Sequence, residues 1–244
     1  MLDLTGAASK IDRAKKHIED FDRDRIAFLS SDPYVVVPQF DAEETVTKYV
    51  LGPLPPIPAD LKLIAGDAAH NLRIALDYLA NELVRAAGFP TKNVYFPICE
   101  SLEKYEADSD GKTKGMPESA KKWIAGRQPY GGGDDALWGL HRLDIIDKHR
   151  LLIAVSTRIG KFHVNLTPTP TEMTFLGMSG SLQEGDVLGV LPGKREAHEH
   201  MDFTFDIAFG EPEVFAGKPV VRTLVKLAWV VESIISHFDP RLDL

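Results

Sequence analysis

The stretch LKLIAGDAAHNLRIALDYLANELVRAAG, residues 61–88, carries the strongest structural signal in this sequence. Its apolar residues recur at steps of three and four, which places them on one side of an α-helix. Gly88 follows the last of them, and glycine is common just beyond a helix end. We therefore predict a helix over about residues 61–87, with an apolar stripe that consists of Ile64, Ala68, Leu72, Ala75, Leu76, Leu79 and Leu83.

Helical spacing recurs on both sides of this segment. Residues 9–29 carry a comparable stripe that Arg25 alone interrupts, and residues 220–238 form an amphipathic pattern. LWGLHRLDIIDKHR (137–150) and PESAKKWIAG (117–126) also read as helices, whereas the polar segment 101–115 is expected to be an excursion. We expect the helices that start near Leu61 and Ala136 to pack together, because neither of these two helices could be stable alone in water.

Short β-branched runs indicate strands in two parts of the chain. PYVVVPQF (33–40) and TVTKYVL (45–51) fit a hairpin. Four runs in the second half resemble strands of a small antiparallel sheet: 161–168, 171–177, 186–192 and 200–210. The sequence therefore predicts an α+β fold, a bundle of long helices with a small antiparallel β-sheet in the C-terminal half. We expect one domain over 1–244, with a helical part to about 158, a β-rich part over about 159–210 and a closing helix over about 219–238.

Composition restricts the classes of function. The net charge of −8, from 36 acidic and 28 basic residues, argues against broad electrostatic adhesion to nucleic acid or to an anionic membrane. A local basic groove is compatible with this net charge. The single cysteine, Cys99, excludes an intramolecular disulfide and a zinc site of several thiolates. The charged N-terminus lacks a signal-peptide core, and no apolar run approaches the ~20 residues of a membrane span. We therefore expect a cytoplasmic protein without membrane contact.

Polar residues line one side of the helix predicted over 61–87. Asp67, His70, Asn71, Ile74, Asp77 and Asn81 follow one another at short helical steps. A pair of His70 and Asp77 would suit acid–base chemistry, because a carboxylate fixes the tautomer of an imidazole and stabilises its charged form. A solvated face, or a buried network that includes Arg73, explains the same pattern without catalysis.

A second dense set of titratable residues lies in 137–150. Arg142 and His149 are seven residues apart, two helical turns, so both side chains can lie on one face about 10 Å apart along the axis. There His149 could move a proton while Arg142 holds a phosphate. The structural alternative is an ion pair of Asp144 with Lys148, with cations near the helix end that favour its dipole. Asp147 and Arg150 complete the set.

Motifs for metals and cofactors are weak. His198 and His200 form H-x-H, which on a strand would place two imidazoles on one face, but no third ligand is identifiable from spacing. YGGGDD lacks the lysine and hydroxyl residue of a phosphate-binding loop, so it reads as a hinge. We expect neither a metal site nor a cofactor.

Three motifs, GDAAHNLRIALDYL, FPI and LWGLHRLDIIDKHR, resemble a family of uncharacterised bacterial proteins, and this resemblance implies a shared fold. The last motif also resembles HEPN domains, helical bundles that often cut RNA after dimerisation. The HEPN resemblance implies that Arg142 and His149 are catalytic. Leu143 departs from the family pattern, which often has a polar residue directly after the arginine.

Two functions follow as hypotheses. The first is an HEPN-like RNA-binding protein or metal-independent ribonuclease, a homodimer with Arg142 and His149 as catalytic residues and with polar support from His70, Asn71, Arg73, Asp77, Asp147 and Arg150. The second is a non-enzymatic binding or scaffold protein in which the polar residues form a buried structural network. A small-molecule enzyme with His70 and His149 in one pocket is a third reading. Burial distinguishes them, because catalytic side chains need access to a cleft.

Overall fold

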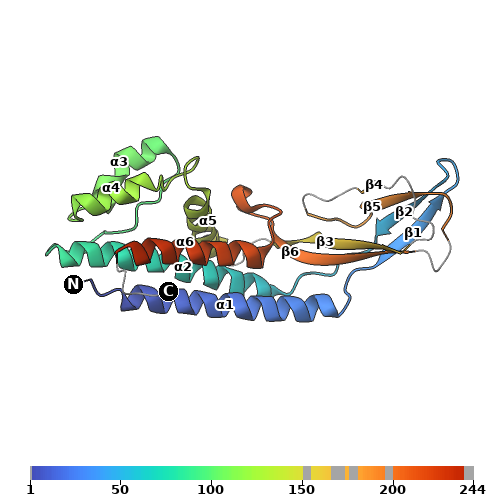
Figure 1. Cartoon of the computed structure of the whole chain (residues 1–244), viewed down its shortest axis with the longest axis horizontal. Helices are drawn as coiled ribbons and strands as arrows, with labels where there is room; N and C mark the ends of the chain where they lie inside the picture. Colours follow the sequence, from blue (N-terminus) through green and yellow to red (C-terminus); the bar gives the residue numbers. More distant parts are fainter. Residues whose placement is uncertain (1, 151–154, 166–173, 176–180, 196–199, 239–244) are drawn as a thin grey trace.

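The protein is elongated, with a helical body at one end and two small sheets at the other (Figure 1). This computed structural model describes residues 2–150, 155–165, 174–175, 181–195 and 200–238. Along that part of the chain, no helix combines the length and the apolar character that crossing a membrane requires.

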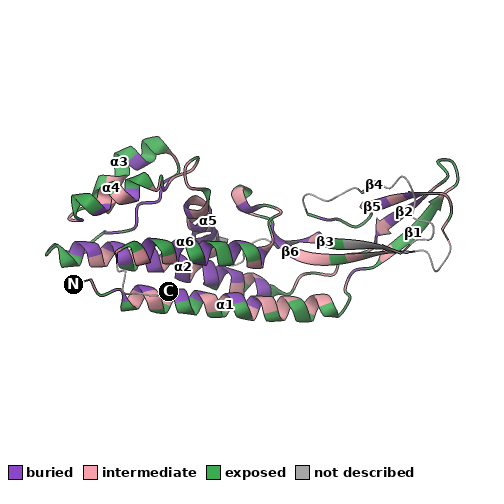
Figure 2. Ribbon diagram, viewed as in Figure 1, coloured by how far each residue is buried: buried purple, intermediate pink, exposed green. Residues whose placement is uncertain are grey.

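Three long helices form the core of the helical body: α1 (Thr5–Ser30), α2 (Ala59–Ala86) and α6 (Val220–Phe238). Each contacts the other two, and Figure 2 shows buried residues where they face one another. The stripe predicted on α2 is confirmed, since its members from Ala68 to Leu83 are buried and Ile64 is half-buried against the same cluster. Gly88 follows the helix with a φ of 81°, a backbone conformation that glycine adopts without strain.

The shorter helices α3 (Leu102–Lys112), α4 (Glu118–Gly126) and α5 (Asp135–Arg150) lie along one side of this core (Figure 1). α5 packs against α2, as expected, and also contacts α6. The prediction of a non-helical excursion over 101–115 was wrong. Ser101 accepts a hydrogen bond from the backbone N–H of Lys104 at the start of α3, and Tyr105 is buried, so capping and one anchoring side chain hold a mostly polar helix.

The strands form two antiparallel groups. β1 (Val36–Asp41), β2 (Val46–Leu51), β5 (Val187–Pro192) and β4 (Thr174–Phe175) make one sheet in the order β1-β2-β5-β4. β3 (Val155–Asn165) and β6 (His200–Phe209) pair separately. The α+β class and the hairpin are confirmed. However, the sheets are not confined to the C-terminal half, because β5 pairs with the early strand β2.

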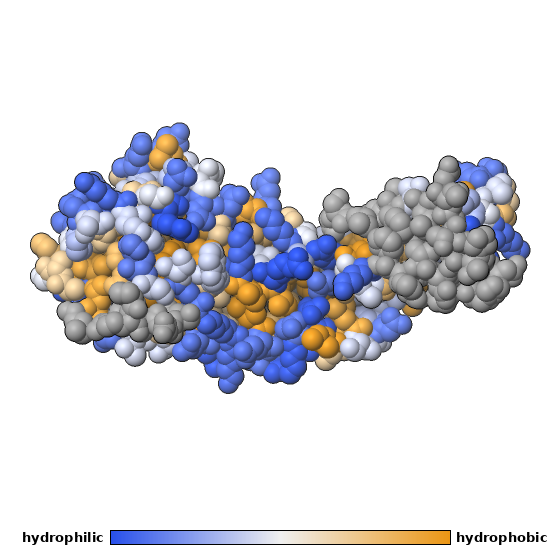
Figure 3. All heavy atoms as spheres, viewed as in Figure 1, coloured by the Kyte–Doolittle hydropathy of each residue, from blue (hydrophilic) through white to orange (hydrophobic). Residues whose placement is uncertain are grey.

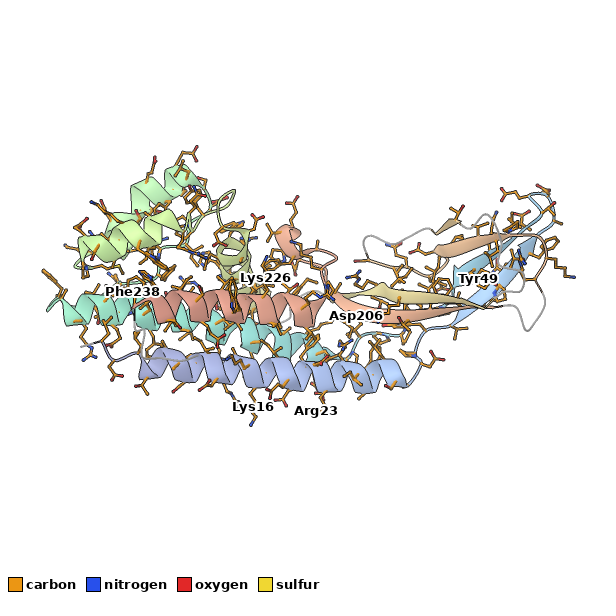
Figure 4. All side chains as sticks on the ribbon, in the orientation of Figure 1. Lys16, Arg23, Tyr49, Asp206, Lys226 and Phe238 are labelled. Atoms are coloured by element: carbon orange, nitrogen blue, oxygen red, sulfur yellow. The ribbon has the colours of Figure 1, made fainter. Side chains whose placement is uncertain are left out.

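Arg25, the residue that interrupts the apolar stripe of α1, links the helical body to the strands. Its Nη1 donates to Oδ1 of Asp206 on β6 at 2.9 Å, and its Nη2 donates to Asp22 at 2.6 Å. Figure 4 shows Asp206 where β6 meets the helices. Arg25 therefore connects α1 to β6, two elements that are distant in sequence.

Candidate functional site

The polar sides of α2 and α5 face each other. The helices approach closely at Gly66, because a Cβ added there would overlap Oδ1 of Asp147. A glycine within a long helix costs about 1 kcal/mol relative to alanine, so a close approach of this kind explains its presence. The contact brings the titratable residues of both helices into one cluster.

Asp144 on α5 joins His70 on α2 to Lys148. Its Oδ1 lies 2.7 Å from Nδ1 of His70, and its Oδ2 accepts from Nζ of Lys148 at 2.6 Å. The side chain of Asp144 is 4% exposed, whereas His70 is 36% and Lys148 50% exposed. When the carboxylate is ionised, Nδ1 of His70 is the donor, so Nε2 of the neutral ring is free to accept a proton. A buried anion thus orients two accessible basic groups.

Arg73 is the centre of a second, more deeply buried set of contacts. Its Nη1 donates to Oδ1 of Asp77 at 2.6 Å, and its Nη2 donates to the carbonyl oxygen of Phe96 at 3.0 Å. The N–H of Phe96 donates to the same Asp77 oxygen at 2.8 Å. The expected pair of His70 with Asp77 was wrong, since Arg73 and Phe96 occupy Asp77 while His70 pairs with Asp144.

His141 lies between these two sets. Nε of Arg73 donates to its Nδ1 at 3.4 Å, a long hydrogen bond. Burial, together with the positive charge of Arg73, lowers the pKa of His141 to about 4, so the ring is neutral at physiological pH. Because Nδ1 accepts, the ring proton is on Nε2, which makes His141 a neutral donor.

A pocket of about 220 Å³ opens between α2, α5 and the segment around Phe96. Its polar lining includes Arg73, Asp77, Lys112, His141, Asp144 and Lys148. Tyr95, which is 52% exposed, and the half-exposed Lys148 line it where it meets solvent. The pocket therefore places the inner cluster within reach of a small ligand.

Arg142 and His149 lie elsewhere on α5. The guanidinium carbon of Arg142 is 5.7 Å from the centre of the Trp138 ring, and His149 is exposed. At about 100° per residue, their side of the helix is roughly a quarter turn from the side of His141 and Lys148. The structure therefore does not gather Arg142 and His149 with His70.

The supporting residues also divide between different surroundings. Asn71 is oriented toward α1, where its Oδ1 accepts from Nζ of Lys10 at 3.3 Å. Asp147 lies against Gly66, and burial together with the charge of Asp67 raises its pKa. The side chain of Arg150 lies outside the described residues.

Several parts of this site were not predicted from the sequence. Lys112 and the backbone of Phe96 come from outside both polar stripes, and spacing along one helix gives no sign of the contact between His70 and Asp144. Gly66 did carry a signal, because a glycine inside a long helical pattern suggests close packing.

Within the described residues, no group of three or more histidine, cysteine, aspartate or glutamate side chains could hold a metal ion. His200 belongs to β6, and His198 lies outside the described residues. No protein-family model, no curated protein and no solved structure matches this chain. The HEPN resemblance therefore stays a prediction.

Proposed function

We propose that this protein is a ribonuclease that cleaves RNA without a metal ion. The HEPN resemblance would place its catalytic residues at Arg142 and His149, whereas the contacts of the described residues support His70 as its general base. The observation that carries the proposal is the contact of His70 with the buried carboxylate of Asp144. A carboxylate that accepts from Nδ1 fixes the tautomer in which Nε2 accepts a proton. The side chain of His70 is 36% exposed, so a substrate can reach the ring.

The reaction would be an internal displacement at phosphorus. His70 takes the proton of a ribose 2′-hydroxyl, and the 2′-oxygen forms a bond to phosphorus. The bond from phosphorus to the 5′-oxygen breaks as that oxygen takes up a proton from water, which leaves a 2′,3′-cyclic phosphate. Lys148 would stabilise the negative charge that develops on the phosphate, because only one of its three N–H donors is used by Asp144.

The HEPN resemblance assigns catalysis to Arg142 and His149 instead, and the two assignments make different predictions. If His70 is the general base, His70 is essential for cleavage and His149 contributes at most to RNA binding. In the HEPN assignment, His149 is essential and a second chain is required, because one Arg/His pair leaves the acid and base roles to be shared across a two-fold interface. Light scattering of the purified protein tests the dimer.

Burial supports a second candidate, a non-enzymatic scaffold. Arg73 and Asp144 are almost completely enclosed, and each nitrogen of Arg73 and each carboxylate oxygen of Asp144 makes a contact, as expected for a network that holds α2 and α5 together. In that case, removing a member of the cluster would lower stability without removing any activity.

The test pairs RNA cleavage with thermal unfolding. Single-stranded RNAs of mixed sequence are incubated with the parent protein and with His70→Ala and His149→Ala variants in EDTA, and products are resolved on denaturing gels. We expect cleavage by the parent, at least a hundredfold loss in His70→Ala, in line with the contribution of a general base, and little change in His149→Ala. Loss in His149→Ala alone would assign the reaction to the HEPN pair. No cleavage by the parent, with a large fall in the melting temperature of His70→Ala, would favour the scaffold.

A further inference from the structure

Besides Arg73, three nitrogen groups line the pocket: His141, Lys112 and Lys148. His70 is connected to the pocket through Asp144, which lines it. The three groups come from α5 and from the end of α3, so the fold, and not one local sequence, brings them together. Each has hydrogen-bonding capacity beyond the contacts described above. His141 carries its proton on Nε2, and each ammonium has three N–H donors.

The two carboxylates of the pocket are already occupied. Asp77 accepts from Arg73 and from the backbone of Phe96, and Asp144 pairs with His70 and Lys148. With His141 neutral, three cations, Arg73, Lys112 and Lys148, face two anions. The pocket therefore has an excess of positive charge and of donors, which suits an anion.

Lys112 is the most adaptable of these groups. Its Nζ makes two contacts of 3.3 Å, with the carbonyl oxygen of Ile98 and with Sγ of Cys99. Both are long or weak hydrogen bonds, and a charge-assisted bond to an anion is about twice as strong as a neutral one. An anion in the pocket would consequently attract this ammonium at small cost.

The volume of the pocket limits the ligand. About 220 Å³ equals the space of roughly seven waters, at about 30 Å³ for each water in the liquid. A tetrahedral phosphate group fits this space, and its oxygens can accept from several of the donors that line it. Tyr95 at the mouth offers an exposed aromatic face on which a base attached to that phosphate can stack.

We propose that this pocket is a phosphate-binding subsite, in which His141, Lys112 and Lys148 hold one phosphate group of a nucleotide strand next to His70. The assignment of the strand as RNA rests on the proposed function, whereas phosphate binding itself does not require cleavage. His141 acts here as a positioning residue that donates a hydrogen bond without adding charge.

The test is calorimetric titration of the full chain with inorganic phosphate, with a nucleoside 3′-monophosphate and with a short RNA. Variants are Lys112→Met and His141→Leu, with His141→Gln as a partial replacement that keeps an N–H donor. Lys114→Met is the matched control, because Lys114 is an exposed lysine outside the pocket. Circular dichroism verifies that each variant is folded.

We expect Lys112→Met and His141→Leu each to weaken phosphate binding about tenfold, because each variant loses at least one charge-assisted hydrogen bond to the anion. His141→Gln should bind phosphate with intermediate affinity, and Lys114→Met should bind it as tightly as the parent. Tighter binding of the short RNA than of inorganic phosphate would identify a strand as the source, and equal binding would identify free phosphate. Absence of phosphate binding in the parent, or equal binding in all variants, would overturn the inference. Phosphate binding without any RNA cleavage would retain the subsite and reject the ribonuclease.

Discussion

α2 meets α1 and α5 through two different kinds of surface. Toward α1 and α6, it contributes leucines and alanines to one apolar cluster, and Figure 3 shows apolar surface between charged edges on the face formed by these helices. Toward α5, whose buried leucines belong to the same cluster, it also contributes the polar residues His70, Arg73 and Asp77. Apolar burial is non-directional, whereas buried polar groups require defined partners. The first surface should therefore dominate stability, and the second should determine geometry and chemistry.

The largest expected change in stability comes from a substitution on the apolar surface of α2. Leu76 is completely buried, and replacing it with alanine should lower the free energy of unfolding by about 2 to 5 kcal/mol, because transfer energy is lost and a cavity remains. Urea denaturation measures the change. Leu63→Ala is the matched control, since Leu63 belongs to the same helix and is 45% exposed. A loss below about 0.5 kcal/mol for Leu76→Ala would contradict a core position.

His141 should make the polar surface sensitive to acid. Its pKa of about 4 lies below the ordinary value of 6.5, so between these values the unfolded chain binds more protons than the folded one. Stability therefore rises with pH through this window and is lost as the pH falls from about 6.5 to about 4. Protonation of His141 should lower the free energy of unfolding by about 1 to 3 kcal/mol over this window. The figure follows from 1.36 kcal/mol per pKa unit, reduced because the ring is partly exposed.

Urea denaturation of the parent and of His141→Gln, at pH values from 4 to 8, measures this slope. The variant should lose much of the dependence, although His17 also has a pKa lowered by burial and should leave a smaller slope of the same sign. Identical pH profiles for parent and variant would show that His141 protonates as easily in the folded protein as in the unfolded chain.

Close packing at Gly66 predicts an effect that a second substitution reverses. In Gly66→Ala, the new methyl group would overlap the carboxylate of Asp147, so this half-exposed side chain must move. The cost should lie at the low end of overpacking, about 1 kcal/mol, and is partly offset by the better helix propensity of alanine. The double variant Gly66→Ala/Asp147→Ala should recover the loss, as measured by the melting temperature. Equal losses in the single and double variants would place the obstruction in the backbone instead.

The same contrast explains what the sequence could predict. A repeating apolar pattern is local, so the stripes of α1 and α2 and the extent of α6 could be predicted from spacing alone. Sheet pairing depends on distant segments, and nothing local indicated that β2 would pair with β5. The site has the same limitation. Spacing did predict the pair of Asp144 with Lys148, four residues apart on one helix, but it chose Asp77 as the partner of His70. A polar partner on another helix has no periodic signature.

The smallest expected effect concerns Asp147. Its pKa is raised by burial and then by the charge of Asp67, so the folded protein holds the carboxyl proton more tightly than the unfolded chain does. Above the raised pKa, the ionised carboxylate opposes folding, and this cost is absent at lower pH where both states are protonated. Asp147→Asn should therefore increase the free energy of unfolding at pH 7 by less than about 1 kcal/mol, which appears as a slightly higher melting temperature. The gain should shrink in 0.5 M salt by the part that comes from Asp67, because screening weakens repulsion between partly exposed charges. A loss of stability in Asp147→Asn at both salt concentrations would mean instead that the ionised carboxylate contributes a favourable contact between α2 and α5.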